Sequence, residues 1–487
     1  MSHSLISEFL KNPNHCNLPG QVLGVTSDSR KVRPGMIFVA IQGGSTDGHA
    51  HIPQAFQAGA LAVVGEASFI PSGEQNYIRV VDSREALALL AAEIEGRPSE
   101  KMLMVAVTGT SGKTTTTYLV ESILKAAGHQ VGVIGTINFR YGEKVIDSTH
   151  TTPGAVELQH LLAEMRQAGC TAVVMEVSSH ALKQKRVGSI AYDAMVFTNL
   201  SPEHLDFHPD MEDYYAAKAS LFKDLADYAV SKGKNPVAAI NGDDPYGKRL
   251  LREVASRSGL KVCEYFTPVL EITLDGISGV ISNIPIQSPL TGGFNGSNIA
   301  GAVALAVGLK LSSEAIMHGV SALKGVPGRL DRVQSKSSVH VWVDYAHKPD
   351  ALEKVLKTLA AIRKGHRLIC VFGCGGDRDR SKRPVMGRHA VALADYTWIT
   401  SDNPRTEKPQ AIIEEILAGV QGVVDSTRFC VEPDRRKAIF GAIQMAKPGD
   451  LVLIAGKGHE NYQILGTQKI HFDDKEVAAE ALSVAKA

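Results

Sequence analysis

The chain has 487 residues, and at roughly 150 residues per domain this length suggests about three domains, each large enough to enclose a core. Its 52 lysine and arginine residues nearly balance its 51 aspartate and glutamate residues, so no overall field would recruit nucleic acid or an anionic membrane. Any anion must therefore be bound by a local cluster of residues.

The six cysteines are scattered along the chain, and only Cys370 and Cys374 lie close together. No second pair completes a zinc site, so we expect reduced thiols, as in a cytosolic protein. The stretch 1–12 lacks the basic segment and apolar core of a secretion signal, and no apolar run approaches the ~20 residues of a membrane span. These features predict a cytoplasmic protein with no membrane span.

Residues 1 to about 98 alternate short apolar stretches with helical ones and predict a small α/β domain. The expected strands are 22–25, 36–41, 61–64 and 77–81, and the expected helices are 52–58 and 84–95. The turn around Ser29 and Arg30 could hold an anionic group such as a diphosphate, or it could be an ordinary solvated turn. The polar segment 96–100 is the first expected boundary.

The stretch 102–118 carries the clearest signal in the chain. Apolar residues 102–107 predict a buried strand, which leads through a glycine loop into a threonine-rich helix. Such a loop directs backbone N–H groups and a helix N-terminus of about +0.5 charge at one point, which suits phosphate. Lys113 can reach the outer phosphates, and the Thr114 hydroxyl can ligate an accompanying Mg²⁺. The spacing G-x-x-G-K-T is shorter than the usual one and indicates a variant phosphate-binding loop.

From residue 101 to about 329, apolar strands alternate with helices, which favours a parallel sheet covered on both faces. We expect strands at 102–107, 131–135, 171–177, 194–199 and 236–240, and helices at 114–127, 155–168 and 213–229. Segment 270–290 predicts inserted β-hairpins, and Asn295 to Asn298 would cap a helix that begins near Ile299. Because ligands gather at the carboxyl ends of parallel strands, polar loops there should face the phosphate loop. These loops are 151–153, 176–180 and 198–206.

After a turn-rich boundary at 325–331 the α/β pattern resumes and predicts a third, doubly wound domain. The expected strands are 339–344, 367–373, 396–400, 428–431 and 451–455, and the expected helices are 349–363, 409–419, 433–446 and 474–485. In the loops after these strands, Arg383 and Arg405 could each grip a carboxylate, and Glu460 could receive an ammonium group. Such a site suits an amino acid, although each charge could equally be a solvated loop residue.

Three residues outside the phosphate loop are candidates for metal chemistry. Glu176 and His204 follow apolar strands, where a carboxylate and an imidazole could ligate a second divalent ion or simply form hydrogen bonds within their loops. Lys218 lies in an expected helix, and its spacing alone indicates an ordinary solvated lysine.

Seven motifs in this order resemble those of the Mur ligases of peptidoglycan synthesis, and the resemblance covers essentially the whole chain. They are residues 108–115, 176–180, 198–206, 215–218, 328–331, 344–349 and 456–460. Asp402 to Arg405 further resembles the members that add meso-diaminopimelate to UDP-N-acetylmuramoyl-L-alanyl-D-glutamate. The family implies three α/β domains: a small UDP-substrate domain at 1–98, a central P-loop ATPase domain with a parallel sheet at 99–331, and a Rossmann-like amino-acid domain at 332–487.

The resemblance also implies which residues form each site. ATP would contact Gly109, Thr110, Ser111, Gly112, Lys113, Thr114, Thr115, Asn295, Arg329 and Asp344. The UDP-substrate would contact Ser27, Ser29, Gly44, Ser45, Thr46, Thr151, Thr152, Ser178, Gln184 and Arg186. Diaminopimelate would contact Arg383, Asp402, Asn403, Pro404, Arg405, Gly456 and Glu460. Magnesium would be held by Thr114, Glu176, His204 and Lys218, and the residues implied in catalysis are Lys113, Glu176, His204 and Lys218.

In the family, the lysine at the position of Lys218 is carbamylated, which reverses the interpretation from spacing alone. An unmodified lysine, with a pKa of about 10.4, is a cation and cannot ligate Mg²⁺. Addition of CO₂ would turn its side chain into an anionic ligand with two oxygens.

The implied reaction has two steps. The D-glutamyl carboxylate attacks the γ-phosphoryl group of ATP to give an acyl phosphate, and the diaminopimelate amine then displaces phosphate to form an amide. We expect Arg405, with Asn403 and Arg383, to recognise the distal carboxylate that lysine lacks. The implied partners are these small molecules and no nucleic acid, and we expect a monomer. The competing interpretations are a lysine-adding sibling, a folylpolyglutamate synthetase-like ligase and a regulator that hydrolyses ATP without ligation.

Overall fold

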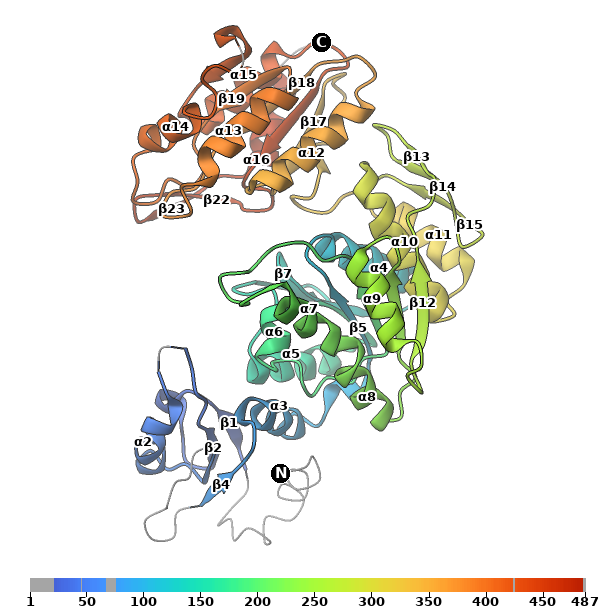
Figure 1. The fold of residues 1–487 in the computed structure, drawn as a ribbon, viewed down its shortest axis with the longest axis vertical. Coiled ribbons are helices and arrows are strands. Elements are labelled where there is room, and N and C mark those ends of the chain that lie inside the picture. The colour runs from blue at the N-terminus through green and yellow to red at the C-terminus, as the bar shows by residue number, and fades with distance from the viewer. Residues whose placement is uncertain (1–21, 45, 67–75, 424, 485–487) are drawn as a thin grey trace. The chain divides into compact units, whose positions relative to one another are not determined.

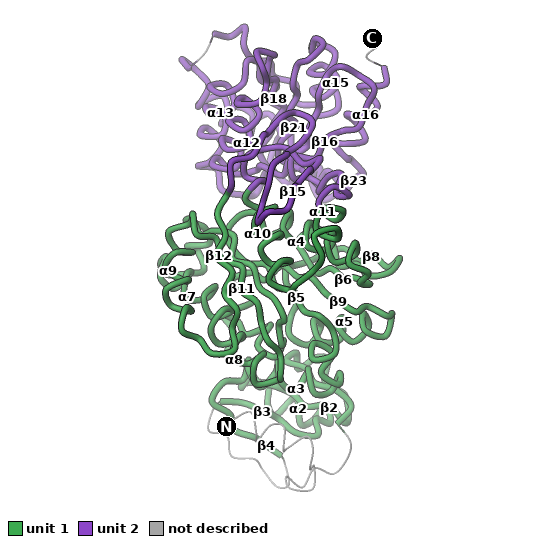
Figure 2. The backbone as a smooth tube through the Cα atoms, turned by 90° about the vertical axis from the view of Figure 1, so that its right-hand side faces the viewer, with its two compact units in different colours: residues 1–267, 297–319 green, residues 268–296, 320–487 purple. Residues whose placement is uncertain are grey.

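The computed structural model describes residues 22–44, 46–66, 76–423 and 425–484, so Ser45 and Cys16 lie outside the described residues. The chain forms two compact units, which Figure 2 draws in different colours. One unit contains residues 1–267 and 297–319, and the other contains residues 268–296 and 320–487. The boundaries expected near residues 98 and 331 remain predictions.

The smaller sheet of the first unit consists of four parallel strands in sequence order (Figure 1). These strands are β1 (Gly24–Thr26), β2 (Met36–Val39), β3 (Ala62–Gly65) and β4 (Tyr77–Arg79). Helix α3 (Ser83–Ile94) begins where the Asp82 carboxylate accepts the Glu85 N–H, and its alanine and leucine side chains pack on one face of the sheet. Helix α2 (Ile52–Gln57) packs on the other face. The small α/β domain predicted from the sequence is therefore present.

The larger sheet of the first unit has the order β12-β11-β10-β5-β9-β6-β7-β8. Its first six strands are parallel: β5 (Leu103–Thr108), β6 (Val131–Ile134), β9 (Ala172–Glu176), β10 (Ala194–Phe197), β11 (Val237–Asn241) and β12 (Lys261–Tyr265). The edge is an antiparallel hairpin, β7 (Asn138–Tyr141) and β8 (Lys144–Asp147), which the sequence analysis did not predict. Strand β5 lies between β9 and β10, so the phosphate loop, Glu176 and Thr198 emerge at one edge.

The helices of this sheet are α4 (Lys113–Ala126), α5 (Ala155–Gln167), α6 (Ser179–Lys183), α7 (Met211–Ala219), α8 (Asp224–Ser231), α9 (Pro245–Val254), α10 (Gly293–Gly308) and α11 (Ser313–Ala322). The expectation of one helix over 213–229 is wrong, because a 3-10 turn at Ser220–Phe222 divides α7 from α8. The expected start of a helix near Ile299 is also wrong. Helix α10 begins at Gly293, and Asn295 donates from Nδ2 back to the carbonyl of Thr291.

The second unit contains a six-stranded sheet of order β16-β17-β21-β18-β19-β20. These strands are β16 (Asp331–Arg332), β17 (His340–Asp344), β18 (Leu368–Phe372), β19 (Tyr396–Ile399), β20 (Phe429–Val431) and β21 (Leu451–Ala455), and only β16 pairs antiparallel. Alternate residues of β18 point to opposite cores. One core is covered by α12 (Pro349–Ile362), α13 (Lys382–Leu393) and α14 (Pro409–Leu417), and the other by α15 (Arg435–Met445) and α16 (Asp474–Val484). Helix α13 was not predicted, since Pro384 and Gly387 interrupt its helical pattern.

Two smaller sheets complete the second unit. The antiparallel strands β13 (Glu271–Ile272), β14 (Ile277–Ile281) and β15 (Ile284–Ser288) confirm the hairpins predicted over 270–290. Strands β22 (Tyr462–Leu465) and β23 (Gln468–His471) form a further hairpin. In the part of the chain that the structure describes, no helix has both the length and the apolar character needed to cross a membrane.

Candidate active site

The loop between β5 and α4 has the backbone geometry of an anion-binding site. Gly109 and Gly112 adopt positive φ angles of 145° and 86°, a region that favours glycine. A Cβ atom at Gly112 would lie only 2.3 Å from Oδ1 of Asn298 in α10. Because α4 has no side-chain cap among the described residues, its first N–H groups point outward without one. This is the arrangement that binds phosphate.

Two lysines donate to the carbonyl groups of this loop. Lys113 Nζ lies 2.9 Å from the Gly109 oxygen and 2.8 Å from the Thr110 oxygen. Lys218 Nζ, which comes from α7, also lies 2.9 Å from the Gly109 oxygen. Lys218 is only 1% exposed, so the interpretation of a solvated lysine from spacing alone is wrong. Burial, followed by the nearby charge of Lys113, holds the pKa of Lys218 well below its usual value.

Glu176, at the end of β9, connects the phosphate loop to the neighbouring strand ends. Its Oε2 accepts hydrogen bonds from the hydroxyls of Thr114 (3.2 Å) and Thr136 (3.0 Å), and its Oε1 accepts the Thr136 N–H at 3.0 Å. The carboxylate is buried, and these partners are all neutral. A buried carboxylate whose hydrogen-bond donors are all neutral would be stabilised by a cation beside it.

His204 lies in the loop after β10 with a positive φ of 58°. Its ring packs edge-on against the ring of His180, with the centroids 4.9 Å apart. Within the described residues, no three His, Cys, Asp or Glu side chains are close enough together to form a ready metal site. A metal at this edge would therefore need ligands of other kinds, such as the Thr114 hydroxyl or a modified Lys218.

A hydrogen-bonded triad centred on His208 joins α6, which begins three residues after Glu176, to the loop that carries His204 and to α7, which carries Lys218. His208 is fully buried, and its Nε2 lies 3.0 Å from Ser179 Oγ at the start of α6. Its Nδ1 lies 2.7 Å from Asp213 Oδ2 in α7. The backbone N–H of His208 donates to the carbonyl of His204 at 2.9 Å.

A cavity of about 540 Å³ opens between β1, α3 and α5. Its polar lining includes Ser27, Asp28, Lys31, Arg84, Gln184 and Arg186. Burial and then the nearby charge of Arg84 lower the pKa of Arg186. Ser27, Gln184 and Arg186 line this cavity, whereas Ser29, Gly44 and Thr46 are not among the lining residues, and the contact of all six with a UDP-substrate stays a prediction.

A chain of hydrogen bonds runs from this cavity to the phosphate loop. Arg186 donates to the carbonyl of Thr152 at 3.0 Å, and the Thr152 hydroxyl donates to the carbonyl of Glu176 at 2.9 Å. The same hydroxyl accepts the N–H of Ser178 at 3.2 Å. Thr151 bonds to Thr136, which holds the Glu176 carboxylate. The expected substrate residues on three different loops are therefore physically connected.

In the second unit, Arg329 lies in the turn before β16, and Asp344 ends the neighbouring strand β17. Asp344 Oδ2 accepts the Leu330 N–H at 2.6 Å, and burial raises the pKa of this carboxyl to about 6. The Arg329 guanidinium lies 5.1 Å from the centre of the Tyr345 ring. Asn295 belongs to the same unit, where it is buried and bonded to the carbonyl of Thr291.

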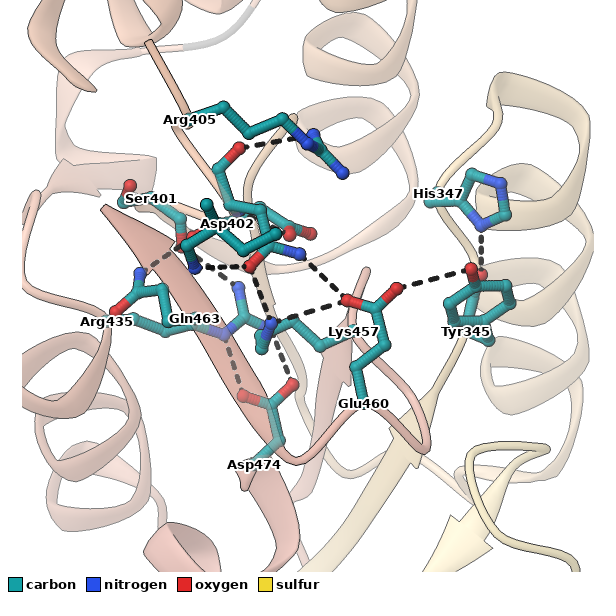
Figure 3. Close-up of polar contacts among 12 residues, drawn as sticks. Tyr345, His347, Ser401, Asp402, Arg405, Arg435, Lys457, Glu460, Gln463 and Asp474 are labelled. Carbon is teal, nitrogen blue, oxygen red and sulfur yellow. Dashed lines mark hydrogen bonds and ion pairs between the residues drawn. The ribbon is translucent and has the colours of Figure 1, made fainter. Parts of the chain in front are cut away.

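The loops after β19 and β21 form a compact polar cluster (Figure 3). Asn403 donates from Nδ2 to Glu460 Oε2 at 2.8 Å, and its Oδ1 accepts the N–H of Ile464 in β22 at 3.0 Å. A Cβ at Gly456 would lie 2.5 Å from Oδ2 of Asp402, so only glycine fits beside this aspartate. Pro404 is buried within the same turn.

The two arginines expected at the amino-acid site differ in their surroundings. Arg405, with a positive φ of 52°, is half-buried, and its Nη1 donates to the carbonyl of Gly376 at 2.8 Å. Arg383 is 0% exposed, and its Nη atoms form ion pairs with Glu407 at 2.7 Å and Glu415 at 2.8 Å. The structure therefore engages Arg383 internally, and its expected contact with a substrate carboxylate remains a prediction.

Sequence comparison identifies the family to which these sites belong. Residues 21–94 match the family description "Mur ligase family, catalytic domain", residues 107–306 match "Mur ligase middle domain", and residues 328–458 match "Mur ligase, glutamate ligase domain". The protein belongs to the Mur ligase family.

Curated relatives of this Mur ligase match it over nearly its full length. A UDP-N-acetylmuramoyl-L-alanyl-D-glutamate–2,6-diaminopimelate ligase of Geobacter metallireducens is 46% identical and covers 96% of each chain. The enzyme of the same name from Gloeobacter violaceus is 47% identical, over 96% of this chain and 95% of its own. A solved structure of that name is 33% identical, with a TM-score of 0.71 and 94% of each chain covered.

Sequence reasoning missed several polar residues of this Mur ligase site. Thr136 bonds Glu176, Asn298 lies close to Gly112 of the phosphate loop, His208 is the centre of the Ser179–His208–Asp213 triad, and Lys457 donates to Asn403. Lys457 stands within a motif that the sequence analysis named and His208 borders one, while Asn298 was named there only as a helix cap. Thr136 follows a short strand in a loop with no distinctive pattern, so its role emerges only from tertiary contacts.

Proposed function

We propose that this chain is an ATP-dependent ligase that adds meso-2,6-diaminopimelate to UDP-N-acetylmuramoyl-L-alanyl-D-glutamate, in the synthesis of peptidoglycan precursors. The carrying observation is the match at 46% and 47% identity, over nearly full length, to enzymes that bear this name. The connected cavity and phosphate loop of the first unit support it, because a long anionic substrate must extend from a binding cavity to ATP. A substrate of UDP, sugar and peptide has this form.

The proposed site residues divide by substrate. Arg84, Arg186 and Lys31 of the cavity would neutralise the diphosphate, and Thr151, Thr152 and Ser178 would guide the peptide toward Glu176. ATP would bind the loop Gly109 to Thr115. Lys113 would then donate its hydrogen bonds to phosphate oxygens in place of the carbonyls of Gly109 and Thr110. Asn295, Arg329 and Asp344 would complete the nucleotide site. Solved Mur ligase-like folds have been crystallised with ADP, among them MurF of Thermotoga maritima, which is 20% identical.

Magnesium is part of the proposal. The residues that would hold it are Thr114, Glu176, His204 and Lys218 as its carbamate, and the buried Glu176 carboxylate with only neutral hydrogen-bond partners fits a cation. The lowered pKa of Lys218 favours the uncharged amine, which is the form that reacts with CO₂. When bound, the ions would neutralise the phosphate charge during phosphoryl transfer.

The mechanism then follows from positions. The substrate carboxylate would be aligned by the strand-end loops for attack on the γ-phosphoryl group, whose developing charge Lys113 and the α4 N-terminus stabilise. The amino acid would be held by the loops at 402–405 and 456–460, with Glu460 receiving an ammonium group and Arg405 a carboxylate. The free amine would attack the acyl phosphate and release phosphate. We further propose a cytoplasmic location, since its ATP and UDP-linked substrates are intracellular metabolites. The proposed oligomeric state is a monomer.

The test is phosphate release from ATP by purified protein given the UDP-dipeptide and a panel of amino acids. We expect release only when both the UDP-dipeptide and an amino acid are present, with meso-diaminopimelate preferred. Efficient use of L-lysine would instead indicate a lysine-adding sibling. ATP hydrolysis that needs neither substrate would indicate a regulator and refute the proposal.

A further inference from the structure

Lys457 is a buried cation beneath the proposed amino-acid site. It follows β21 and is 0% exposed. Its Nζ lies 3.2 Å from Asn403 Oδ1 and 3.5 Å from Glu460 Oε2 (Figure 3 shows Lys457 and Glu460), and 5.4 Å from the centre of the Tyr462 ring. Burial lowers the pKa of Lys457, while the carboxylates of Asp402 and Glu460 oppose this shift. A buried amino group is stable only when it is hydrogen-bonded, and these hydrogen bonds restrict the orientations of its partner side chains.

The first consequence concerns the side-chain amide of Asn403. Its Oδ1 faces two donors, Lys457 Nζ at 3.2 Å and the Ile464 N–H at 3.0 Å. A carbonyl oxygen has two acceptor positions, so both are filled. The Nδ2 group must then turn to the opposite side, where it donates to Glu460 Oε2 at 2.8 Å. Lys457 therefore helps to determine which end of the amide faces the site.

The second consequence concerns the carboxylate of Glu460. Oε2 receives both Asn403 Nδ2 and Lys457 Nζ. Oε1 faces only the Tyr345 hydroxyl among the hydrogen bonds that the described residues make to it, at the long distance of 3.4 Å. This leaves Oε1 with acceptor capacity for an ammonium group of an incoming amino acid.

The third consequence concerns charge. The acidic side chains of this cluster are Asp402, Glu460 and Asp474, and the basic ones are Arg405, Arg435 and Lys457, so the two kinds are equal in number. Removal of the Lys457 charge would leave the cluster net negative. At neutral pH meso-diaminopimelate has no net charge and lysine has one positive charge, so a net negative site would favour lysine.

We propose that Lys457 is a positioning residue that sets the selectivity of the amino-acid site for a substrate with a distal carboxylate, by orienting Asn403 and balancing Glu460. The inference rests on the proposed function. It assigns Lys457 no contact with substrate. Its effect passes through two neighbours that would touch the amino acid.

The test compares Lys457→Met, which removes charge and donor, with Lys457→Gln, which keeps an amide donor for Asn403. The readout is the ratio of kcat/KM for meso-diaminopimelate to that for L-lysine, because this ratio does not depend on the fraction of folded enzyme. We expect the ratio to fall about 10- to 100-fold in Lys457→Met, the size expected for one charge-assisted interaction, and less in Lys457→Gln. The KM for ATP should stay unchanged.

Lys234→Met is the matched control. Lys234 is also mostly buried and donates to two backbone carbonyls and to Asp193, but it belongs to the first unit, whereas these loops belong to the second. Its ratio should equal that of the unmodified protein. A ratio within about twofold of the unmodified value in Lys457→Met would overturn the inference and leave the proposed function intact. An unmodified protein with no preference for meso-diaminopimelate over lysine would overturn both.

Discussion

Lys113 and Lys218 donate hydrogen bonds to the same carbonyl oxygen, that of Gly109, each from 2.9 Å. Two amino groups that converge on one oxygen repel each other when both are charged, which contributes to the lowered pKa of the buried Lys218 after the larger effect of burial. The arrangement places Lys113, which would face the phosphates, beside a second amine whose pKa is lowered by burial. The two lysines thus have different chemistry although they share a partner.

Replacement of Lys113 by methionine should abolish peptide-bond synthesis. The substitution keeps the length of the side chain but removes the cation that would stabilise the transferring phosphoryl group, so we expect kcat to fall about 10³-fold. Phosphate release in the presence of both co-substrates measures this. Lys125→Met, at an exposed position of the same helix, should retain activity. Undiminished synthesis by Lys113→Met would refute the role of the phosphate loop.

Lys218 should be carbamylated in the active enzyme. Protein equilibrated with ¹³C-bicarbonate should give a carbamate carbon signal by NMR, and Lys218→Arg should lack both this signal and activity, because a guanidinium does not form a stable carbamate. Lys248→Arg, on the exposed surface of α9, should keep the signal. A carbamate signal that persists in Lys218→Arg would show that the modified group lies elsewhere.

His208 should strengthen magnesium binding indirectly, because its hydrogen bonds hold α6, α7 and the loop of His204 together. His208→Gln can keep the contact with Ser179, and His208→Asn can keep the contact with Asp213, whereas His208→Ala loses both. We expect His208→Ala to raise the magnesium concentration for half-maximal activity about 10- to 100-fold, as for other residues that orient metal ligands. The two partial variants should show smaller increases.

The control for the His208 variants is Ser189→Ala. Ser189, like Ser179, is a buried serine of the first unit. Its hydroxyl donates to the carbonyl of Ala88 and accepts a hydrogen bond from Gln159, away from the phosphate loop. This substitution should lower thermal stability without changing the magnesium requirement. Equal magnesium curves for His208→Ala and Ser189→Ala would mean that His208 serves only the fold.

Arg405 should determine recognition of the distal carboxylate. Arg405→Lys keeps a positive charge but loses the planar fork, so we expect kcat/KM for meso-diaminopimelate to fall at least tenfold while the KM for ATP is unchanged. Arg436→Lys, on an exposed position of α15, serves as the comparison. If Arg405→Lys lowered activity with meso-diaminopimelate and with lysine by the same factor, recognition of the distal group would have to lie elsewhere.

Asp344 should make stability depend on pH. Its folded pKa is raised to about 6 from 3.8 by burial, so the folded state binds a proton more tightly than the unfolded chain. The stabilisation from this proton is complete below about pH 4 and is lost as the pH rises through about 6. Asp344→Asn should therefore raise the free energy of unfolding at pH 8 by up to about 3 kcal/mol and change it little at pH 4.

The Asp344 prediction is measured by denaturant unfolding at both pH values. The asparagine can still accept the Leu330 N–H through its amide oxygen, so the hydrogen bond itself need not be lost. A gain in stability that is equal at pH 4 and pH 8 would contradict the assignment of the effect to ionisation. Loss of ligase activity in the same variant would fit the proposed place of Asp344 in the nucleotide site.

Local sequence determined much of the architecture and the phosphate loop. The apolar run 102–107 followed by two glycines, Lys113 and four threonines specifies a buried strand, a tight loop and a helix start without help from distant residues. The alternation of strands and helices likewise predicted the parallel central sheet and its C-terminal counterpart. The family could be recognised from the sequence, because the seven motifs and their order along the chain can be read directly from it.

Tertiary structure decided the environments of the side chains. Lys218 has the sequence context of a solvated helix residue, yet its burial against Gly109 changes its chemistry. Arg383 and Arg405 looked alike in the sequence, but only packing showed that Arg383 is held by Glu407 and Glu415. The pKa and the hydrogen bonds of a side chain depend on which residues distant in sequence come within a few ångströms of it. The pattern of apolar and polar residues along the chain does not reveal those distances.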